Sequence, residues 1–202
     1  GVAMVAKHFC AQGETTGGVN ASAARIGERE LREIHLPPAK ACCKAGVNGI
    51  MAAYNEIDGV YCHMNHKLLT QILRDEFGFD GIVMADGMAL NRLQEVIGDR
   101  AQAAALALSA GGDVSLWGGV FPYLEESVKK GLLEESLLDE AVRRELTLKF
   151  EQGLFEHPYL PEKTLLSFDL ADYPQSEQLA EESVVLLKNT GVLPLAKTVK
   201  KI

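Results

Sequence analysis

The residue best placed for chemistry is Asp86, which stands where a short apolar run ends. Residues 81–87 read Gly-Ile-Val-Met-Ala-Asp-Gly, and consecutive apolar residues are typical of a strand buried on both faces of a parallel sheet. Barrels and open α/β sheets bind ligands at the carboxyl ends of such strands. The sequence therefore favours a binding or catalytic role for Asp86. The alternative is that Asp86 only caps the following helix, because Asp is a favoured N-cap residue.

Two further apolar runs, residues 2–6 and 49–53, also stop at polar side chains. Because the carboxyl ends of parallel strands lie on one face, we expect the polar side chains at these ends to converge. A cation, an imidazole, a phenol and a carboxylate can together bind a polyhydroxylated ligand through hydrogen bonds. The four candidate site residues are Lys7, His8, Tyr54 and Asp86.

Two other chemistries are open at this stage. A lysine at a strand end can form a Schiff base with a carbonyl substrate, so a lyase that uses Lys7 is one alternative. His63 and His66 have a spacing that could hold a metal ion, but no third ligand is indicated, so we predict no metal site.

Helical patterns fill the gaps between the strand-like runs. Good helix formers occupy residues 28–45 and 100–110, and Asn65 can cap a helix that ends near Gly78. Residues 113–117 form a weaker fourth strand candidate. Strands that alternate with helices at this spacing predict an α/β fold of parallel βα units, forming part of a (β/α)8 TIM-type barrel.

After Trp117 the strand signals cease. Residues 121–130 and 136–150 read as helices, the second with Ser136 and Asp139 as a capping-box-like start and an apolar face at i+4 spacing. We predict a partial barrel domain over 1–152, a proline-containing linker over 153–175, and the start of a second α/β domain over 176–202. The four strand units are half of a barrel, so we expect a piece of a larger protein, or a sheet that another copy or partner completes.

Bulk properties exclude some partners. A net charge of -8 over 202 residues argues against a nucleic-acid surface, and no apolar run approaches the roughly 20 residues of a membrane helix. The four cysteines lack metal-ligand spacing and suit no simple disulfide framework, so we expect buried free thiols. Free thiols favour a reducing compartment such as the cytoplasm, and no signal peptide is visible.

Recognisable motifs run through nearly the whole chain in order. They are Lys-His-Phe at 7–9, Gly-Gly-Val-Asn at 17–20, Gly-Glu-Arg-Glu-Leu-Arg-Glu at 27–33, Met-Ala-Ala-Tyr-Asn at 51–55, Leu-Thr-Gln-Ile-Leu-Arg-Asp-Glu-Phe-Gly-Phe-Asp-Gly-Ile-Val-Met-Ala-Asp at 69–86, Ala-Gly-Gly-Asp at 110–113, and Glu-Ser-Val-Val-Leu-Leu-Lys-Asn at 182–189. This series resembles the glycoside hydrolase family 3 β-glucosidases.

The resemblance implies a retaining exo-β-glycosidase that forms a covalent glycosyl-Asp intermediate and needs no cofactor. In retaining enzymes two carboxyl groups about 5–5.5 Å apart flank the scissile bond. By motif, Asp86 matches the nucleophile, and Lys7 and His8 match the pair that holds sugar hydroxyls. Tyr54 matches the tyrosine beside the nucleophile. The implied partner is a β-glycoside or oligosaccharide substrate.

Three departures from the family pattern qualify these expectations. The acid/base glutamate usually comes from the second domain, and the half-barrel that usually precedes Lys7 is also outside this sequence. Both are expected from the same full-length protein or a partner chain. The usual Ser-Asp-Trp is Ala-Asp-Gly at 85–87, which implies a lost apolar platform and a wider site. A catalytically silent, sugar-binding fragment is therefore an alternative.

The sequence after Phe9 narrows the branch of the family. The related N-acetylglucosaminidases carry a second histidine shortly after the Lys-His-Phe motif. Here the motif continues Cys-Ala-Gln-Gly-Glu at 10–14, so the glucosidase or xylosidase side is favoured.

Overall fold

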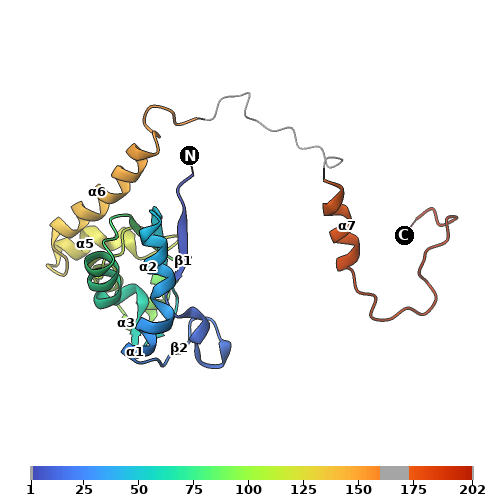
Figure 1. Cartoon of the computed structure of the whole chain (residues 1–202), viewed down its shortest axis with the longest axis horizontal. Coiled ribbons are helices and arrows are strands. Elements are labelled where there is room, and N and C mark those ends of the chain that lie inside the picture. Colours follow the sequence, from blue (N-terminus) through green and yellow to red (C-terminus); the bar gives the residue numbers. More distant parts are fainter. Residues whose placement is uncertain (1, 160–172, 202) are drawn as a thin grey trace. The chain divides into compact units, whose positions relative to one another are not determined.

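The computed structural model describes residues 2–159 and 173–201 of the chain. Contacts divide the chain into two units, Gly1–Pro158 and Tyr159–Ile202, and each is described by itself (Figure 1). The predicted domain limits of 1–152, 153–175 and 176–202 stay a prediction, and residues 160–172 of the predicted linker lie outside the described residues.

A parallel sheet forms the centre of the first unit. Its strands are β1 (Val5–Phe9), β3 (Gly49–Ala52) and β6 (Ile82–Ala85), hydrogen-bonded in the order β1-β3-β6. The strand order follows the chain, as in consecutive βα units of a TIM-type barrel. The predicted α/β fold with parallel strands is confirmed. The predicted fourth strand, 113–117, is reduced to one parallel bridge between Met84 and Val114.

Strand β1 begins later and runs further than the pattern predicts. The sequence places a strand at residues 2–6 with Lys7 and His8 beyond its end, whereas both residues lie inside β1. The register with β3 is irregular between Ala6 and Phe9, and the Lys7–His8 and Phe9–Cys10 peptide bonds are cis. The apolar pattern missed this extension because it stops at the first charged residue.

The polar loop after β1 carries a small accessory sheet. Strand β2 (Ala23–Ala24) pairs with β4 (Glu56–Ile57), which pairs in turn with β5 (Val60–Tyr61). Two short 3-10 turns, η1 (Gln12–Glu14) and η2 (Thr16–Gly18), precede β2. The accessory sheet therefore connects the loops that follow β1 and β3.

The predicted helix over 28–45 is divided into three segments. They are α1 (Glu28–Glu30), the π-helical η3 (Leu31–His35) and α2 (Pro37–Lys44). The break falls where Pro37 and Pro38 begin α2, because a proline lacks the N–H that a continuous helix needs but suits a first helical turn. Helix α2 contacts β1, and Figure 1 shows the two running beside each other.

The helix after β5 agrees with its sequence pattern. The 3-10 turn η4 (Cys62–Met64) leads into the π-helical η5 (Lys67–Glu76). Asn65 Oδ1 accepts a hydrogen bond from the backbone N–H of Leu68 at 3.0 Å, which confirms the predicted cap. The apolar face is buried in the main core, and it comprises Leu68, Leu69, Ile72 and Leu73.

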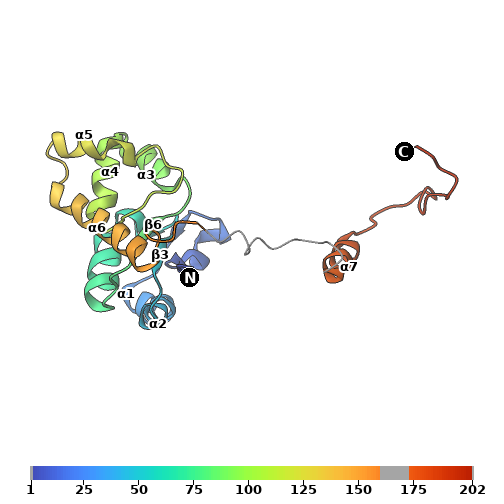
Figure 2. The ribbon, with the colours of Figure 1, turned by 90° about the horizontal axis from the view of Figure 1, so that it is seen from above.

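Two helices, rather than one crossover helix, follow Asp86. They are α3 (Ala89–Ile97) and α4 (Arg100–Ser109), which lie side by side (Figure 2). Asp99 ends the turn between them and caps α4, because its Oδ1 accepts the Gln102 N–H at 2.7 Å. The sequence predicted α4 and named the first helix only as a segment that Asp86 could cap.

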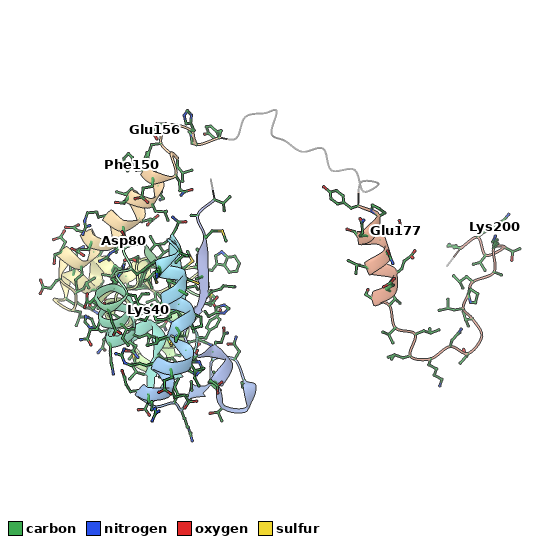
Figure 3. The ribbon with its side chains drawn as sticks, in the orientation of Figure 1. Lys40, Asp80, Phe150, Glu156, Glu177 and Lys200 are labelled. Carbon is green, nitrogen blue, oxygen red and sulfur yellow. The ribbon has the colours of Figure 1, made fainter. Side chains whose placement is uncertain are left out.

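The first unit ends in a third group of helices. These are η6 (Phe121–Tyr123), α5 (Leu124–Lys129) and α6 (Glu135–Glu151). The predicted capping box at Ser136 is wrong, because the N-cap residue is Glu134 and no side chain caps the helix. The predicted apolar face is only partly buried. Leu138 packs against a core cluster, whereas Val142, Leu146 and Phe150 (labelled in Figure 3) are exposed.

Asp113 ties several of these elements together. Its carboxylate is buried and accepts hydrogen bonds from Arg74 Nη2 at 2.6 Å, Arg144 Nη1 at 2.9 Å and the Val83 N–H at 2.7 Å. The donors come from η5, α6 and β6, so a single acid links two helices to the sheet. Asp113 is the last residue of the Ala-Gly-Gly-Asp motif at 110–113. Its hydrogen bonds stabilise the packing of the helices on the sheet.

The second unit contains one helix among its described residues, α7 (Pro174–Ser183), which carries the Glu177 labelled in Figure 3. Residues 184–188, which follow α7, are not helical. No helix in the described part of the chain has the length and apolar character needed to cross a membrane.

Candidate active site

Asp86 directly follows β6, at the carboxyl end of the sheet. Its side chain is 16% exposed, and its Oδ1 accepts the backbone N–H of Gly87 at 2.7 Å. The N-cap residue of α3 is Met88, and no side chain caps that helix. The alternative that Asp86 serves as a helix cap is therefore wrong, and one carboxylate oxygen is turned to other groups.

That second oxygen faces His8. The distance from Asp86 Oδ2 to His8 Nε2 is 3.2 Å, and the His8 side chain is 23% exposed. These residues are 78 positions apart in the chain but come from β1 and from the end of β6, which both flank β3. The structure thus brings together two of the residues that the strand-end pattern selected.

Tyr54 lies on the same edge, two residues beyond β3. Its hydroxyl donates a hydrogen bond to the Gly87 carbonyl. Burial of the phenol raises the pKa of Tyr54, and the negative charge of Asp86 raises it further, whereas the Arg92 guanidinium acts in the opposite direction. Arg92 lies 5.9 Å from the centre of the Tyr54 ring. Tyr54 is therefore a neutral phenol beside the Asp86 carboxylate.

Lys7 is separated from this group. Its side chain is exposed, and within the described residues it has no hydrogen bond or ion pair. Together with His8, it lines a hollow of about 100 Å³ between β1 and α2, whose lining also includes His35 and Cys42. The structure brings together His8, Tyr54 and Asp86, whereas Lys7 makes no hydrogen bond or ion pair with Tyr54 or Asp86 among the described residues.

His63 is a neighbour of Asp86 that the sequence pattern did not select for this site. It is buried in η4, and its Nε2 accepts the backbone N–H of Asp86 at 3.3 Å. Burial lowers the pKa of His63 to about 4, and the charge of Asp86 acts in the opposite direction. A neutral imidazole therefore holds the backbone of Asp86. No local sequence signal separates His63 from the exposed His66.

An open hollow of about 320 Å³ lies on the Tyr54 side of Asp86. Its lining residues are Asn20, Tyr54, Gly87, Met88 and Arg92. An amide, a phenol and a guanidinium supply hydrogen-bond donors and acceptors suited to a hydroxylated ligand. Arg92 and Asn20 come from α3 and from the loop after β1, and sequence reasoning did not select them.

A metal centre has no ligand set in the described ranges. Among residues 2–159 and 173–201, no group of three or more His, Cys, Asp or Glu side chains could hold a metal ion. The four cysteines, all in the first unit, are free; Cys10 and Cys62 are buried, whereas Cys42 and Cys43 are partly exposed. The expectation of buried thiols is met at two of the four positions.

Together, these features define a class of protein. A parallel βα sheet of TIM-barrel type, with a carboxylate and a histidine paired at the carboxyl end of its strands, has the site position of barrel enzymes. The hydrogen-bonding groups around the carboxylate suit a polyhydroxylated ligand.

Comparison with known proteins gives the family. The sequence profile of the glycosyl hydrolase family 3 N terminal domain matches residues 1–148. A putative β-xylosidase of Formosa agariphila is 40% identical over 97% of this chain and 27% of its own length. A β-glucosidase of Rhizobium radiobacter is 39% identical over 98% of this chain and 23% of its own length. The chain thus spans about a quarter of the length of these curated relatives.

Solved structures agree with the sequence relatives. A β-glucosidase from Listeria innocua superposes with a TM-score of 0.78 at 33% identity, covering 96% of this chain and 28% of that structure. A β-glucosidase from Erythrobacter marinus superposes with a TM-score of 0.76 at 39% identity, covering 94% and 26%. The chain belongs to glycoside hydrolase family 3, as its motifs predicted.

Proposed function

We propose that this chain carries the nucleophile of a retaining exo-β-glycosidase that removes terminal β-linked glucose or xylose. The observation that carries the proposal is the position of Asp86. Its carboxylate lies at the carboxyl end of β6, 3.2 Å from His8 and open to the site edge through a partly exposed side chain. Helix α3 begins after Met88 and has no side-chain cap, so Asp86 is not needed to cap it.

The proposed reaction has two steps. Asp86 attacks the anomeric carbon of the terminal sugar while a second carboxyl group protonates the departing glycosidic oxygen, which gives a covalent glycosyl-Asp86 intermediate. Water activated by the same second group, now a carboxylate, then releases the sugar with the original anomeric configuration. We assign the second carboxyl group to no residue of this chain.

The neighbours of Asp86 receive supporting roles. His8 has its Nε2 3.2 Å from the Asp86 carboxylate, and we propose it as a substrate-binding residue whose imidazole binds a sugar hydroxyl next to Asp86. Tyr54, held by Gly87 and beside Asp86, is proposed as the tyrosine that flanks the nucleophile. Lys7 was expected beside His8, and its binding role stays a proposal that requires its flexible side chain to turn from its present hollow.

The substrate class rests on the relatives. They bear the names β-xylosidase and β-glucosidase, and the Listeria β-glucosidase has been solved with glucose and, as a mutant, with laminaribiose. A terminal β-linked pyranose is the ligand common to these names. We further propose residues 1–152 as the barrel portion, 153–175 as the linker and 176–202 as the start of a second domain, supported by the division of contacts near Pro158.

A Schiff-base lyase is not favoured by any observation. Nucleophilic lysines are activated by burial in an apolar pocket or by a neighbouring cation. Lys7 is exposed, and among the other site residues only His8 lines the same hollow. A sugar-binding role without catalysis remains an alternative, because the chain spans only about a quarter of the length of its relatives.

The test compares two proteins, the full polypeptide that the gene encodes and its Asp86→Ala variant. The measurement is turnover of aryl β-glucosides and aryl β-xylosides. We expect the substitution to remove at least about 99.9% of the turnover, since nucleophile loss costs several powers of ten in rate. The control is Asp80→Ala, which removes an exposed acid in the loop before β6 and should retain activity. Undiminished turnover in Asp86→Ala would refute the assignment.

A further inference from the structure

Trp117 is the one tryptophan of the chain, and its side chain is 88% exposed. An exposed indole is unusual, because aromatic side chains stabilise a fold chiefly when they are buried. Its backbone is unusual as well, with a φ of 53°, a left-handed conformation that bulky residues rarely adopt. Strained, exposed positions of this kind cluster at ligand-binding sites.

The indole stands beside the proposed nucleophile. A Cβ atom built on Gly87, the residue after Asp86, would lie 3.6 Å from Trp117 Cε3 and 3.8 Å from the Tyr54 hydroxyl. The indole therefore borders the space that a side chain at position 87 would enter. In the family pattern that position carries a tryptophan, and here it carries glycine.

The loop that carries Trp117 is fixed rather than loose. The Ala85 N–H donates to the Val114 carbonyl at 2.7 Å, and the Met88 N–H donates to the Leu116 carbonyl at 3.0 Å. On the far side of Trp117, the Gly119 N–H donates to Asn91 Oδ1 at 3.0 Å. Hydrogen bonds on both sides of Trp117 thus attach the loop to the segment from the end of β6 to α3. The backbone that carries the indole is therefore in place before a ligand binds, which lowers the entropy cost of binding.

We propose that Trp117 is a substrate-binding residue whose indole packs against the apolar face of a pyranose ring. The C–H groups of a β-linked sugar form a flat apolar face, which suits an aromatic ring, while Tyr54 and Arg92 can bind its hydroxyl groups. Trp117 lies in the loop that follows α4. From there it would supply the aromatic platform that a glycine at position 87 cannot provide. This inference deepens the proposed function and rests on it.

The experiment compares Trp117→Ala and Trp117→Phe with the wild-type polypeptide as its gene encodes it. For aryl β-glucosides and aryl β-xylosides, we expect Trp117→Ala to raise KM about tenfold, the scale of one lost aromatic contact. Trp117→Phe, which keeps an aromatic face, should raise KM less than about threefold. Tyr159→Ala removes a comparably exposed aromatic residue, and its KM should be that of the wild type.

The outcomes separate this proposal from the one on which it rests. If the wild type turns over glycosides and Trp117→Ala keeps its KM, or if Tyr159→Ala raises KM equally, the platform is wrong although the glycosidase assignment stands. If the wild type turns over none, the glycosidase assignment falls, and calorimetric titration with cellobiose and xylobiose decides on the platform. Binding weakened about tenfold by Trp117→Ala supports it. Equal affinities, or no binding by the wild type, overturn it.

Discussion

Acidification should destabilise the first unit through His63. Burial lowers the pKa of this imidazole from 6.5 to about 4 in the folded protein. Between these two pH values the unfolded chain binds a proton at His63 that the folded chain does not. The free energy of unfolding therefore falls as the pH decreases from 6.5 to 4, and this contribution is constant above and below that window.

The magnitude follows from the width of the window. At about 1.4 kcal/mol for each pH unit, a pKa lowered from 6.5 to about 4 corresponds to about 3 kcal/mol. Most small domains have total stabilities of about 5–15 kcal/mol, so the effect is large enough to measure. Protonation of Nε2 would also remove the acceptor for the Asp86 N–H.

Urea denaturation at several pH values from 4 to 7, followed by far-UV circular dichroism, measures this effect. His63→Gln keeps a neutral acceptor and cannot titrate, so its unfolding free energy should decrease by about 3 kcal/mol less than that of the wild type over the window. His66→Gln, which removes an exposed histidine three residues further on, is the matched control. Parallel curves for the wild type and His63→Gln would refute the reasoning.

Three other substitutions should change stability by amounts that the packing fixes. Asp113→Ala should cost about 3–5 kcal/mol, because it leaves the largely buried Arg74 guanidinium without its carboxylate partner; a loss under about 1 kcal/mol in urea denaturation would contradict this. Leu69→Ala should cost about 2–5 kcal/mol, because that side chain is fully buried in the main core, and an unchanged denaturation midpoint would count against the packing described. Gly111→Ala should lower the melting temperature, because the residue has a φ of 112° and its new Cβ would lie 2.8 Å from Thr70 Oγ1; calorimetry that shows the same or a higher melting temperature would disprove this steric account.

Some elements were predictable because local signals and tertiary packing agree. The run at 82–84 is apolar without alternation, and β6 is buried on both sides of the sheet. Asn65 and the leucine spacing after it located η5 to within a few residues. Asp86 was found because the end of that strand is marked by an abrupt change from apolar residues to a carboxylate.

Other elements depended on contacts that no local pattern records. Lys7 and His8 are polar, so the hydrophobic pattern ended β1 too early, although pairing with β3 carries the strand to Phe9. His63 lies in η4, and only the tertiary fold brings its imidazole into contact with the backbone of Asp86. Trp117 gave no periodic signal, because its place beside Gly87 depends on a loop held by backbone hydrogen bonds.

The central claim is that Asp86 forms a covalent bond with the anomeric carbon, and trapping of that bond tests it most directly. The polypeptide as its gene encodes it would be incubated with 2,4-dinitrophenyl 2-deoxy-2-fluoro-β-glucoside, digested, and analysed by tandem mass spectrometry. The account predicts a single fluoroglucosyl group on the peptide that contains Asp86, located on that carboxylate. A label on another carboxylate, or turnover of β-glucosides with inversion at the anomeric carbon, would contradict it.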